Sequence, residues 1–512
     1  MKKLLMLCIG LLSVSLIAQD TTDALNYSLD NMQGTARFRA MSGAFGALGG
    51  DLSSIQINPA GSAIFNNGFA AASLGFFNNN TDIRYNTNSA NTINSFRNTE
   101  ADLNQAGATV VFVNSNPNSP WKKFALSGAY ENTGNFNNEW ISSGISTTSI
   151  DSYFQHFTNN IEIPFGILKL QPDEFIEEAY ADIGSIPGDG YGIQQAFLGY
   201  WAGIIDPINL DDETNDLETD YISNIAEGEF NQSYVFSERG YNGKLAFNFA
   251  AEYDDKLSVG INLNAHFIDR ERYTRLNESN TNDGSIVTNL AFENLLTTTG
   301  SGFSFQLGAI LKVTPELRAG FSYQSPTWYR INEELVQGIN SNNADPEINF
   351  ISSVINIFPE YRLSTPGSMT GSLAYVFGKK GLISFDYMVK DYSNTRFRPT
   401  NDRSFTAINN QIDDVFTTSN SYRLGGEYRY KQFSFRGGYR FEESPYEDDR
   451  FFGDLTGYSA GLGYNFGQYN IDIAFSQSER QIEQQLYNVG LTNRAAIDSK
   501  FTDIILTFGI KL

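Results

Sequence analysis

Apolar and polar side chains alternate along many segments of this chain, and this alternation limits the fold more than any other feature. It is clearest in two segments, 242–253 and 257–268, which are separated by Asp254 and Asp255. One face of the two segments carries Leu245, Phe247, Phe249, Leu257, Val259, Ile261, Leu263 and Phe267. A period of two puts alternate side chains on opposite faces of a β-strand. About ten residues is also the length that crosses a bilayer as a tilted strand, so the pattern predicts membrane-spanning strands.

The pattern recurs often enough to build a closed barrel. We expect about fourteen strands, near 68–77, 105–114, 122–131, 242–253, 257–268, 303–313, 317–330, 366–377, 382–393, 420–430, 432–443, 456–466, 470–478 and 502–512. Short turns alternate with long polar loops between them, which a soluble β-sandwich does not require. In lipid only a closed barrel satisfies every strand backbone group. The sequence therefore predicts an all-β fold, a transmembrane antiparallel β-barrel of about fourteen strands over residues 68–512.

The first eighteen residues have the pattern of a secretory signal peptide. A basic start, Lys2 and Lys3, precedes an apolar run that ends at Ala18. The only cysteine, Cys8, lies in this segment, so we expect no thiol in the exported chain. Loss of residues 1–18 removes two of the 35 basic residues and changes the net charge from −23 to −25. We expect location in a Gram-negative outer membrane, and the acidity argues against nucleic acid as a partner.

One short motif resembles a hydrolase site. "GYSAG" at 457–461 matches the nucleophile-elbow pattern, which requires a strand-to-helix turn and a later histidine. Strand alternation continues through this segment, and the only histidines, His156 and His266, both precede it. An outer-membrane lipase that uses His266 is therefore a remote alternative, and the protein is not expected to be an enzyme. With two histidines and no thiol, we expect no metal site and no cofactor.

Residues 19–67 precede the first predicted strand and are rich in small and turn-forming residues. Apolar residues recur there at steps of three and four: Phe38, Met41, Phe45 and Leu48. This spacing predicts a short amphipathic helix. Asp51 is expected to cap a second short turn, which Asn58-Pro59 ends. The glycines lack the Lys-Ser/Thr pair of a phosphate-binding loop, so we expect a small hatch inside the barrel lumen.

The order of these features resembles a known family. A small-residue helix, an acidic-Ser turn, Asn-Pro-Ala-Gly and a first strand are similar to the hatch of FadL/TodX-type outer-membrane transporters. Further similarity lies in "LRAGFSYQSP" at 317–326 and "YRLGGEYRYKQFSFRGGYRFEESPY" at 422–446. The family takes up long-chain fatty acids or aromatic hydrocarbons through a fourteen-stranded barrel with an internal hatch.

The resemblance also implies where ligand is controlled. It places the hatch signature, Asn58-Pro59-Ala60, beside an inward kink of the third strand, near 122–131, through which ligand leaves sideways. We expect Gly128 to be the bend. The expected ligand-binding or gating residues of the hatch are Phe45, Leu48, Asn58, Pro59 and Ala60.

The longest loop predicted outside the cell, 132–240, contains two apolar stretches. In the first, a probable helix carries Phe175, Ile176, Ala179, Tyr180 and Ile183 on one face. The second stretch includes Phe197 and Trp201. Two interpretations stay open: Phe175, Tyr180, Phe197 and Trp201 contact a hydrophobic ligand, or the stretches pack on each other as a lid.

Arginines mark the predicted lumen face of strands 420–430 and 432–443: Arg423, Arg429, Arg436 and Arg440. Glu427 and Glu442 share that face. A bracing Arg–Glu network is one interpretation, and contact of one arginine with a ligand carboxylate is the other.

These features favour passive uptake of hydrophobic small molecules, with outer-membrane lipid as the surroundings and a monomer as the expected state. A barrel of the same fold that acts as a binding or shuttle protein in protein secretion or surface attachment is the alternative. The unmatched region 132–240 would serve that role.

Overall fold

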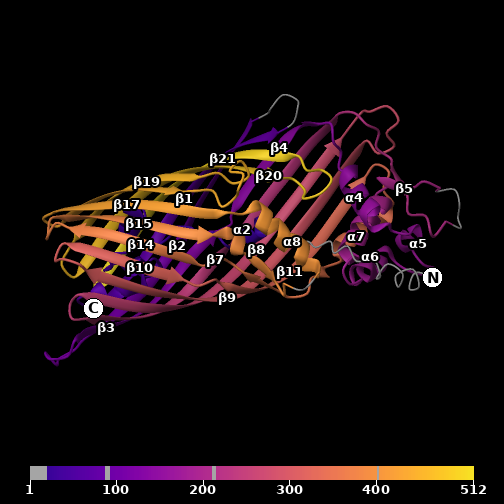
Figure 1. Ribbon diagram of the computed structural model, residues 1–512. Coiled ribbons are helices and arrows are strands. Elements are labelled where there is room, and N and C mark those ends of the chain that lie inside the picture. The colour runs from indigo at the N-terminus through magenta and orange to yellow at the C-terminus, as the bar shows by residue number, and fades with distance from the viewer. Residues whose placement is uncertain (1–19, 87–92, 210–214, 401–402) are drawn as a thin grey trace.

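The computed structural model describes residues 20–86, 93–209, 215–400 and 403–512. The predicted signal peptide, 1–18, lies outside the described residues. A closed barrel of 14 antiparallel strands dominates the fold (Figure 1). Its strands are β1 (Phe69–Asn86), β2 (Ile93–Val113), β3 (Trp121–Asn135), β7 (Phe230–Tyr253), β8 (Leu257–Ser279), β9 (Asn289–Lys312), β10 (Leu317–Gln324), β14 (Ser368–Val376), β15 (Gly381–Asp391), β17 (Thr418–Tyr430), β18 (Phe433–Glu442), β19 (Leu455–Asn465), β20 (Tyr469–Gln485) and β21 (Arg494–Lys511). The last strand pairs with the first, from Phe69 with Lys511 to Asn86 with Arg494, and this pairing closes the barrel. The predicted fold class is confirmed.

The remaining elements lie inside the barrel or at one end of it. Those of the N-terminal segment are α2 (Thr21–Asn26), α3 (Ala36–Ala40), η1 (Leu52–Gln56) and η2 (Pro59–Ile64). The others are β4 (Asn138–Ser146), α4 (Asp151–Ile161), α5 (Phe165–Leu168), α6 (Ile176–Gly184), α7 (Gly190–Trp201), β5 (Ile205–Pro207), β6 (Tyr221–Ser223), β11 (Trp328–Ser341), η3 (Pro346–Ser353), β12 (Asn356–Ile357), β13 (Tyr361–Ser364), η4 (Tyr392–Asn394), β16 (Arg396–Arg398) and α8 (Arg403–Val415). Among the described residues, no helix combines the length and the apolar character that a membrane crossing requires.

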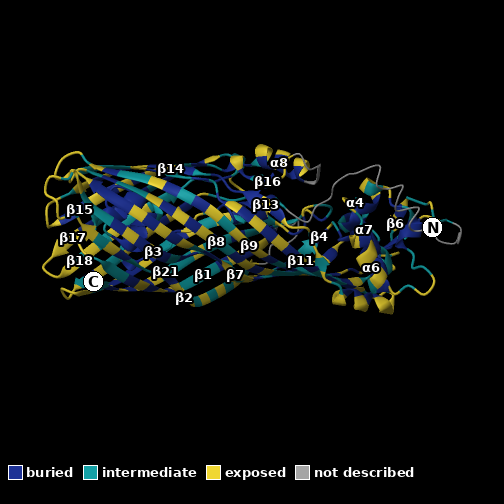
Figure 2. Cartoon of the chain, turned by 90° about the horizontal axis from the view of Figure 1, so that it is seen from below, coloured by how far each residue is buried: buried dark blue, intermediate teal, exposed yellow. Residues whose placement is uncertain are grey.

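A band of apolar side chains surrounds the barrel on its outward face. Exposed and buried residues alternate along the strands, as Figure 2 shows. The exposed set includes Leu74, Phe247, Leu263, Phe303, Phe321, Leu373, Ile383, Leu424, Phe435, Tyr458, Ile473 and Leu506. An exposed apolar band of this kind is the surface that lipid covers in a transmembrane barrel. The apolar side chains of the alternating pattern therefore lie on the lipid-facing surface, as the sequence predicted.

The two ends of the barrel differ. Short turns join β7 to β8, β9 to β10, β14 to β15, β17 to β18 and β19 to β20, and all of them lie at one end, called here the turn end (Figure 1). The helices α4 to α7 lie at the opposite end, called here the cap end. That the turn end faces the periplasm remains a prediction.

Strand pairing is interrupted at two neighbouring places, one of which lies within a strand that the sequence predicted as continuous. β10 ends at Gln324 and β11 begins at Trp328, with Pro326 between them. β13 and β14 are likewise separated by Thr365-Pro366-Gly367. Proline has no backbone N–H to donate, so it interrupts a ladder at both places. The predicted strand 317–330 is therefore two shorter strands.

The loop predicted at 132–240 is shorter than expected, because strands occupy both ends of this region. β3 continues to Asn135, β4 pairs with β7, and β7 already begins at Phe230. Among the described residues of this region, 147–209 and 215–229, called here the cap, lie beyond these strands and carry α4 to α7. The strands continue because their inner face is apolar at this height and packs against the cap helices, which the sequence alternation alone did not show.

The N-terminal segment, residues 20–67, lies inside the barrel and is called here the hatch. Thr35 caps α3, and Asp51 caps η1 by accepting a hydrogen bond from Ser53 N at 2.9 Å, as predicted for Asp51. The predicted helix is shorter than expected, because Ser42 and Gly43 have φ angles of 50° and 75° and end it. Asn58 does not end the second turn but caps a third one, η2, with Pro59 in its first position.

Candidate ligand path through the hatch and the barrel wall

The barrel wall holds the hatch largely by hydrogen bonds to the hatch backbone. Three wall amides donate to carbonyl oxygens: Asn248 to Pro59 at 2.9 Å, Asn262 to Ile55 at 2.8 Å and Gln306 to Ile57 at 3.0 Å. In the opposite sense, the N–H groups of Phe45 and Gly46 donate to Asp386 Oδ2, both at 2.9 Å. A neutral bond such as those of the three amides contributes about 0.5–1.5 kcal/mol, and a bond to a charged group such as the Asp386 carboxylate contributes about 1.5–3 kcal/mol. Many weak bonds therefore hold the turn-rich part of the hatch.

Ion pairs hold the first part of the hatch more firmly. Asp23 on α2 pairs with Arg270 at 2.7 Å and with Arg272 at 2.8 Å, and its side chain is 3 % exposed. Burial acts to raise the pKa of Asp23, but the attraction of Arg272 and Arg270 outweighs it and keeps this pKa below its ordinary value. Breaking a buried pair costs about 3–5 kcal/mol.

Further ion pairs extend this anchoring to α3. Arg37 pairs with Glu427 at 2.9 Å, and Arg39 pairs with Asp503. Residues 43–64 make mostly neutral bonds in the structure, so they are the part of the hatch that moves at least cost.

The predicted gating residues occupy two places in the hatch. Phe45 and Leu48 are buried and pack with Met32, Phe38 and Met41. Asn58 lies against β8 and β9: its Nδ2 donates to Gly46 O at 2.8 Å and to Ala309 O at 3.0 Å.

Two glycines make the seat for this turn. Gly260 on β8 and Gly308 on β9 are directly opposite partners. A Cβ at Gly260 would lie 2.5 Å from the Pro59 carbonyl carbon, and one at Gly308 would overlap Asn58 Oδ1. The turn therefore docks at the β8–β9 glycine pair, while η2, which begins at Pro59, also contacts β3. The role of Asn58-Pro59-Ala60 beside an opening at the third strand stays a prediction.

The third strand departs from regular pairing at places other than Gly128. Its register with β2 and β7 runs without interruption through Gly128. The register shifts against β7 fall instead between Trp121 and Lys123 and between Asn132 and Gly134. The irregularities in pairing therefore lie at the two ends of the strand, and the bend expected at Gly128 stays a prediction.

Backbone pairing between β2 and β3 stops part-way up the barrel. The last pair toward the cap end is Gln105 with Glu131, although β2 extends from there to Ile93. Beyond this pair, side chains connect the two edges: Asn132 Nδ2 donates to Asp102 Oδ2 at 2.5 Å, and Asn135 Nδ2 donates to Glu100 Oε2 at 2.5 Å. We call this gap, between residues 93–104 and 132–146, the seam. It is a place where the wall can part without loss of a backbone ladder.

The seam begins next to the lipid-facing band and next to the hatch. Leu103, 40 % exposed, faces outward beside its first residues. Asn104 forms a bulge in β2 that turns its buried side chain inward, where Nδ2 donates to Gly34 O of the hatch. Ile55 of η1 packs on Ala129 of β3, two residues from the last backbone pair. The hatch thus contacts both edges of the seam.

The lumen arginines form a network with carboxylates. Glu427 accepts from Arg436 at 2.7 Å and pairs with Arg429 at 2.5 Å, in addition to Arg37. Arg436 also pairs with Asp472 at 2.5 Å. Glu442 pairs with Arg440 at 3.5 Å and lies 4.0 Å from Arg423. Arg429, whose side chain is 45 % exposed, lies near the turn end. This geometry favours bracing of the wall over recognition of a ligand carboxylate.

Substitution of Arg436 by Gln separates these two roles. We expect uptake of oleate and of an uncharged alkane to fall by the same factor, because the substitution loosens the wall and removes no ligand contact. Radiolabelled uptake by cells measures both. Arg450→Gln, at an exposed position where the arginine pairs with Asp448 outside this network, is the matched control and should change neither. A loss confined to oleate would instead place a ligand carboxylate at Arg436.

The four residues predicted to contact ligand in the cap differ in how far their side chains are buried. Tyr180 and Phe197 are fully buried, Trp201 is half-buried, and they pack with the inner face of the extended strands. Tyr180 Oη donates to Gln337 at 2.7 Å, and Trp201 Nε1 donates to Leu168 O at 2.9 Å. Phe175 is 63 % exposed, because it precedes the first turn of α6 in an extended conformation. Its assignment to the same face as Tyr180 is wrong, and the other contacts fit the lid interpretation.

The hydrolase motif has no catalytic geometry. Ser459 of "GYSAG" lies within the continuous strand β19 and bonds Ser42 Oγ at 2.8 Å. His266 lies on β8 and bonds Ser304 Oγ at 2.8 Å. Across the described ranges, no cluster of three or more His, Cys, Asp or Glu side chains is arranged to hold a metal ion.

Comparison with known proteins decides the family. A family model described as "Outer membrane protein transport protein (OMPP1/FadL/TodX)" matches residues 213–507, which is more than half of the chain. The chain belongs to this family. The resemblance stated from the sequence is therefore confirmed, and the protein is a non-enzymatic outer-membrane channel of the OMPP1/FadL/TodX family. No curated protein matches the sequence significantly.

Solved structures agree on the fold. The toluene transporter TodX of P. putida is 12 % identical with a TM-score of 0.51, over 94 % of this chain and 99 % of that one. A FadL homologue of Pseudomonas aeruginosa is 14 % identical with a TM-score of 0.50, over the same shares of the two chains, 94 % and 99 %. At such low identity these similarities establish the barrel and its N-terminal segment, and the ligand has to be argued from this chain.

Proposed function

We propose that the protein takes up hydrophobic molecules, such as long-chain fatty acids or aromatic hydrocarbons, and releases them sideways into the membrane through the seam. The observation that carries the proposal is the end of backbone pairing at Gln105 and Glu131, beside both the lipid-facing band and the hatch. A hydrophobic molecule that leaves there enters lipid without crossing water. The closed barrel requires no second chain, which supports a monomer.

The hatch supplies the gate in this proposal. Residues 43–64 are rich in glycine and make no ion pair with the wall among the described residues, so in this proposal they move while ion pairs keep the first part of the hatch in place. Their movement would withdraw Ile55 from Ala129 and free the lumen side of the seam. Motions of this kind set the rate of many channels and enzymes.

Uptake by cells with and without the gene tests the function. We expect loss of the protein to lower uptake of radiolabelled oleate or toluene, because the outer membrane otherwise resists apolar solutes. Sucrose entry should be unchanged, since the hatch fills the lumen with bonded backbone. Equal uptake of both hydrophobic compounds by the two strains would contradict the proposal.

A second candidate function uses the exposed apolar side chains of the cap end. Phe175, Phe350 and Ile357 are 63 %, 59 % and 74 % exposed. A binding or shuttle protein in secretion or surface attachment would present such a face to a protein partner. In that case the deletion strain would lose a surface-attached protein while it kept hydrophobic uptake.

A further inference from the structure

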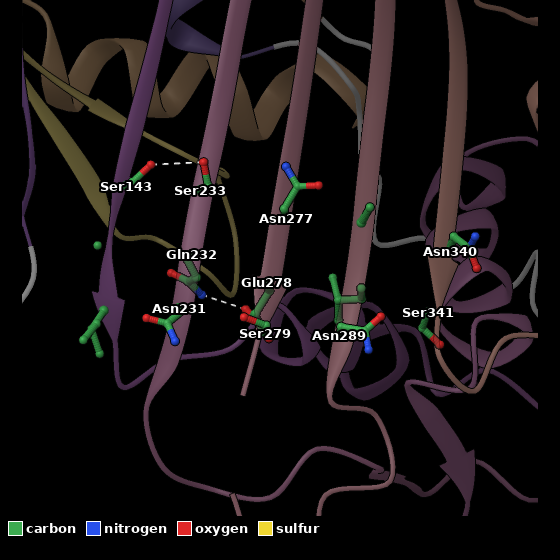
Figure 3. Close-up of a pocket in the computed structure, with 14 residues that line it drawn as sticks. Ser143, Asn231, Gln232, Ser233, Asn277, Glu278, Ser279, Asn289, Asn340 and Ser341 are labelled. Atoms are coloured by element: carbon green, nitrogen blue, oxygen red, sulfur yellow. Dashed lines mark hydrogen bonds between the residues drawn. The ribbon is translucent and has the colours of Figure 1, made fainter. Parts of the chain in front are cut away.

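A groove lies on the outward face of the strands, beyond the part of the seam that borders the lipid-facing band, and Ser143, Gly144 and Ile145 at the cap end of the seam form one side of it. It has a volume of about 810 Å³ and lies near the cap ends of β4, β7, β8, β9 and β11 (Figure 3). On β8 the outward apolar residues end at Phe267, and the groove residue Asn277 follows ten positions later. A strand rises about 3.3 Å per residue, so the groove lies about 30 Å along the strand from the lipid-facing band. It therefore faces water.

Strand register arranges the groove side chains in straight rows. Ser143, Ser233, Asn277, Ala291 and Asn340 are successive partners across the five strands. Asn231, Ser279 and Asn289 form the adjacent row. Neighbouring strands are about 4.8 Å apart, so the first row is about 19 Å long. The groove is thus an elongated surface that repeats one chemistry.

The amides of this surface have unused hydrogen-bonding capacity. Asn231, Asn289 and Asn340 are exposed, and within the part of the chain that the structure describes their side chains make no hydrogen bond. Each amide offers two donors and one acceptor. Figure 3 shows these side chains on neighbouring strands.

The groove carries no free charge, although the chain has 58 acidic residues. The one carboxylate in its lining, Glu278, points to the inner face, where it accepts from Ser149 Oγ at 2.5 Å, Ile150 N at 3.0 Å and Gln232 Nε2 at 2.7 Å. Beside the groove, Arg275 and Glu293 are opposite partners of opposite sign, and the exposed Glu229 lies two residues before Asn231. The lining itself offers no outward charge to pair with a cation or an anion.

We propose that this groove binds a neutral glycan. Sugar hydroxyls act as donors and acceptors at once, which is the capacity that the three amides leave unused. Ile145 and Ala291 provide apolar contacts for the C–H faces of the sugar rings. An extended row of uncharged side chains also fits a linear oligosaccharide of several sugar rings better than a compact solute.

Two sources share this chemistry, namely the polysaccharide of the cell's own surface and a free oligosaccharide from outside. The test is calorimetric titration of the purified protein in detergent with neutral hexasaccharides of glucose and of mannose, and with polysaccharide isolated from the source cells. We expect binding of at least one of them. The triple variant Asn231→Ala, Asn289→Ala, Asn340→Ala should weaken that binding about ten-fold or more, because three sets of hydrogen bonds are lost.

Asn332→Ala is the matched control, since Asn332 is exposed on the same face of β11 but lies eight residues from Asn340. It should bind like the wild type. Electrophoretic mobility without heating checks that each variant is a folded barrel. Oleate uptake should be unchanged in all of them, so a failure of the glycan proposal can be told apart from a failure of the transport proposal. Wild-type affinity in the folded triple variant, or no binding of any of these glycans up to about 10 mM, a concentration that detects weak ligands, would overturn the proposal.

Discussion

Cross-linking the two edges of the seam is expected to stop hydrophobic uptake. The double variant Asp102→Cys, Asn132→Cys places thiols where two side chains now share a hydrogen bond of 2.5 Å. A short thiosulfonate reagent would join them, and the only native cysteine, Cys8, lies in the predicted signal peptide. Uptake of oleate should fall about ten-fold or more, because the wall can no longer part in the conformational step that releases ligand. A reducing agent should restore it.

A second cysteine pair provides the control. Thr109 and Ser127 are opposite partners in the paired part of β2 and β3, with their hydroxyl oxygens 2.8 Å apart. Joining these positions adds nothing to a wall that a backbone ladder already holds, so uptake should be unchanged. Ligand binding by the purified seam variant should also survive cross-linking. If the cross-linked seam variant took up oleate at the wild-type rate, release would have to occur elsewhere.

Filling the seat of the hatch is expected to have the second large effect. The double variant Gly260→Val, Gly308→Val places side chains in the space of Asn58 and Pro59. The turn can then no longer dock, and Asn58 loses its bonds to Gly46 and Ala309. Two lost hydrogen bonds cost about 1–3 kcal/mol, and 1.4 kcal/mol is about ten-fold in population, so the displaced hatch should become about five-fold to 150-fold more populated. Single-channel conductance in planar bilayers should rise, and protease should cut the hatch faster.

Gly371→Val is the matched control, because a Cβ at that outward position on β14 has no atom within 4 Å. It should leave conductance and proteolysis unchanged. A folded double variant with wild-type conductance and a protected hatch would show that Asn58-Pro59 is not what holds the hatch in place.

The barrel was largely predictable because lipid imposes a simple rule on the sequence. Each strand must expose apolar side chains on one face, so alternation located all fourteen strands, and a one-residue shift would have reversed the faces. The cap of a short turn in the hatch was equally predictable, because Asp51 accepts its hydrogen bond from Ser53, only two residues away. Such features depend on neighbours in sequence.

Features that depend on residues far apart in the sequence could not be predicted from it. The alternation did not reveal how far β7 and β8 continue beyond the lipid, because there the cap and not the membrane decides which face is apolar. Phe175 appeared to belong to a buried helix face, yet it precedes the helix and is exposed. The end of pairing at Gln105 and Glu131 also leaves no local signal, because it results from the relative paths of two strands.

The sequence by itself therefore determined that this chain is a fourteen-stranded membrane barrel of a known family with a turn-rich segment ahead of it. The sequence also predicted that this segment lies in the lumen, but only the tertiary structure decided which strands its turns dock on. The turn Asn58-Pro59 lies at Gly260 and Gly308 because these opposite glycines leave space for its backbone. Nothing in the sequence next to either glycine indicates that it contacts the turn. The gate and the groove are likewise properties of register between strands, and register is fixed only when the barrel closes.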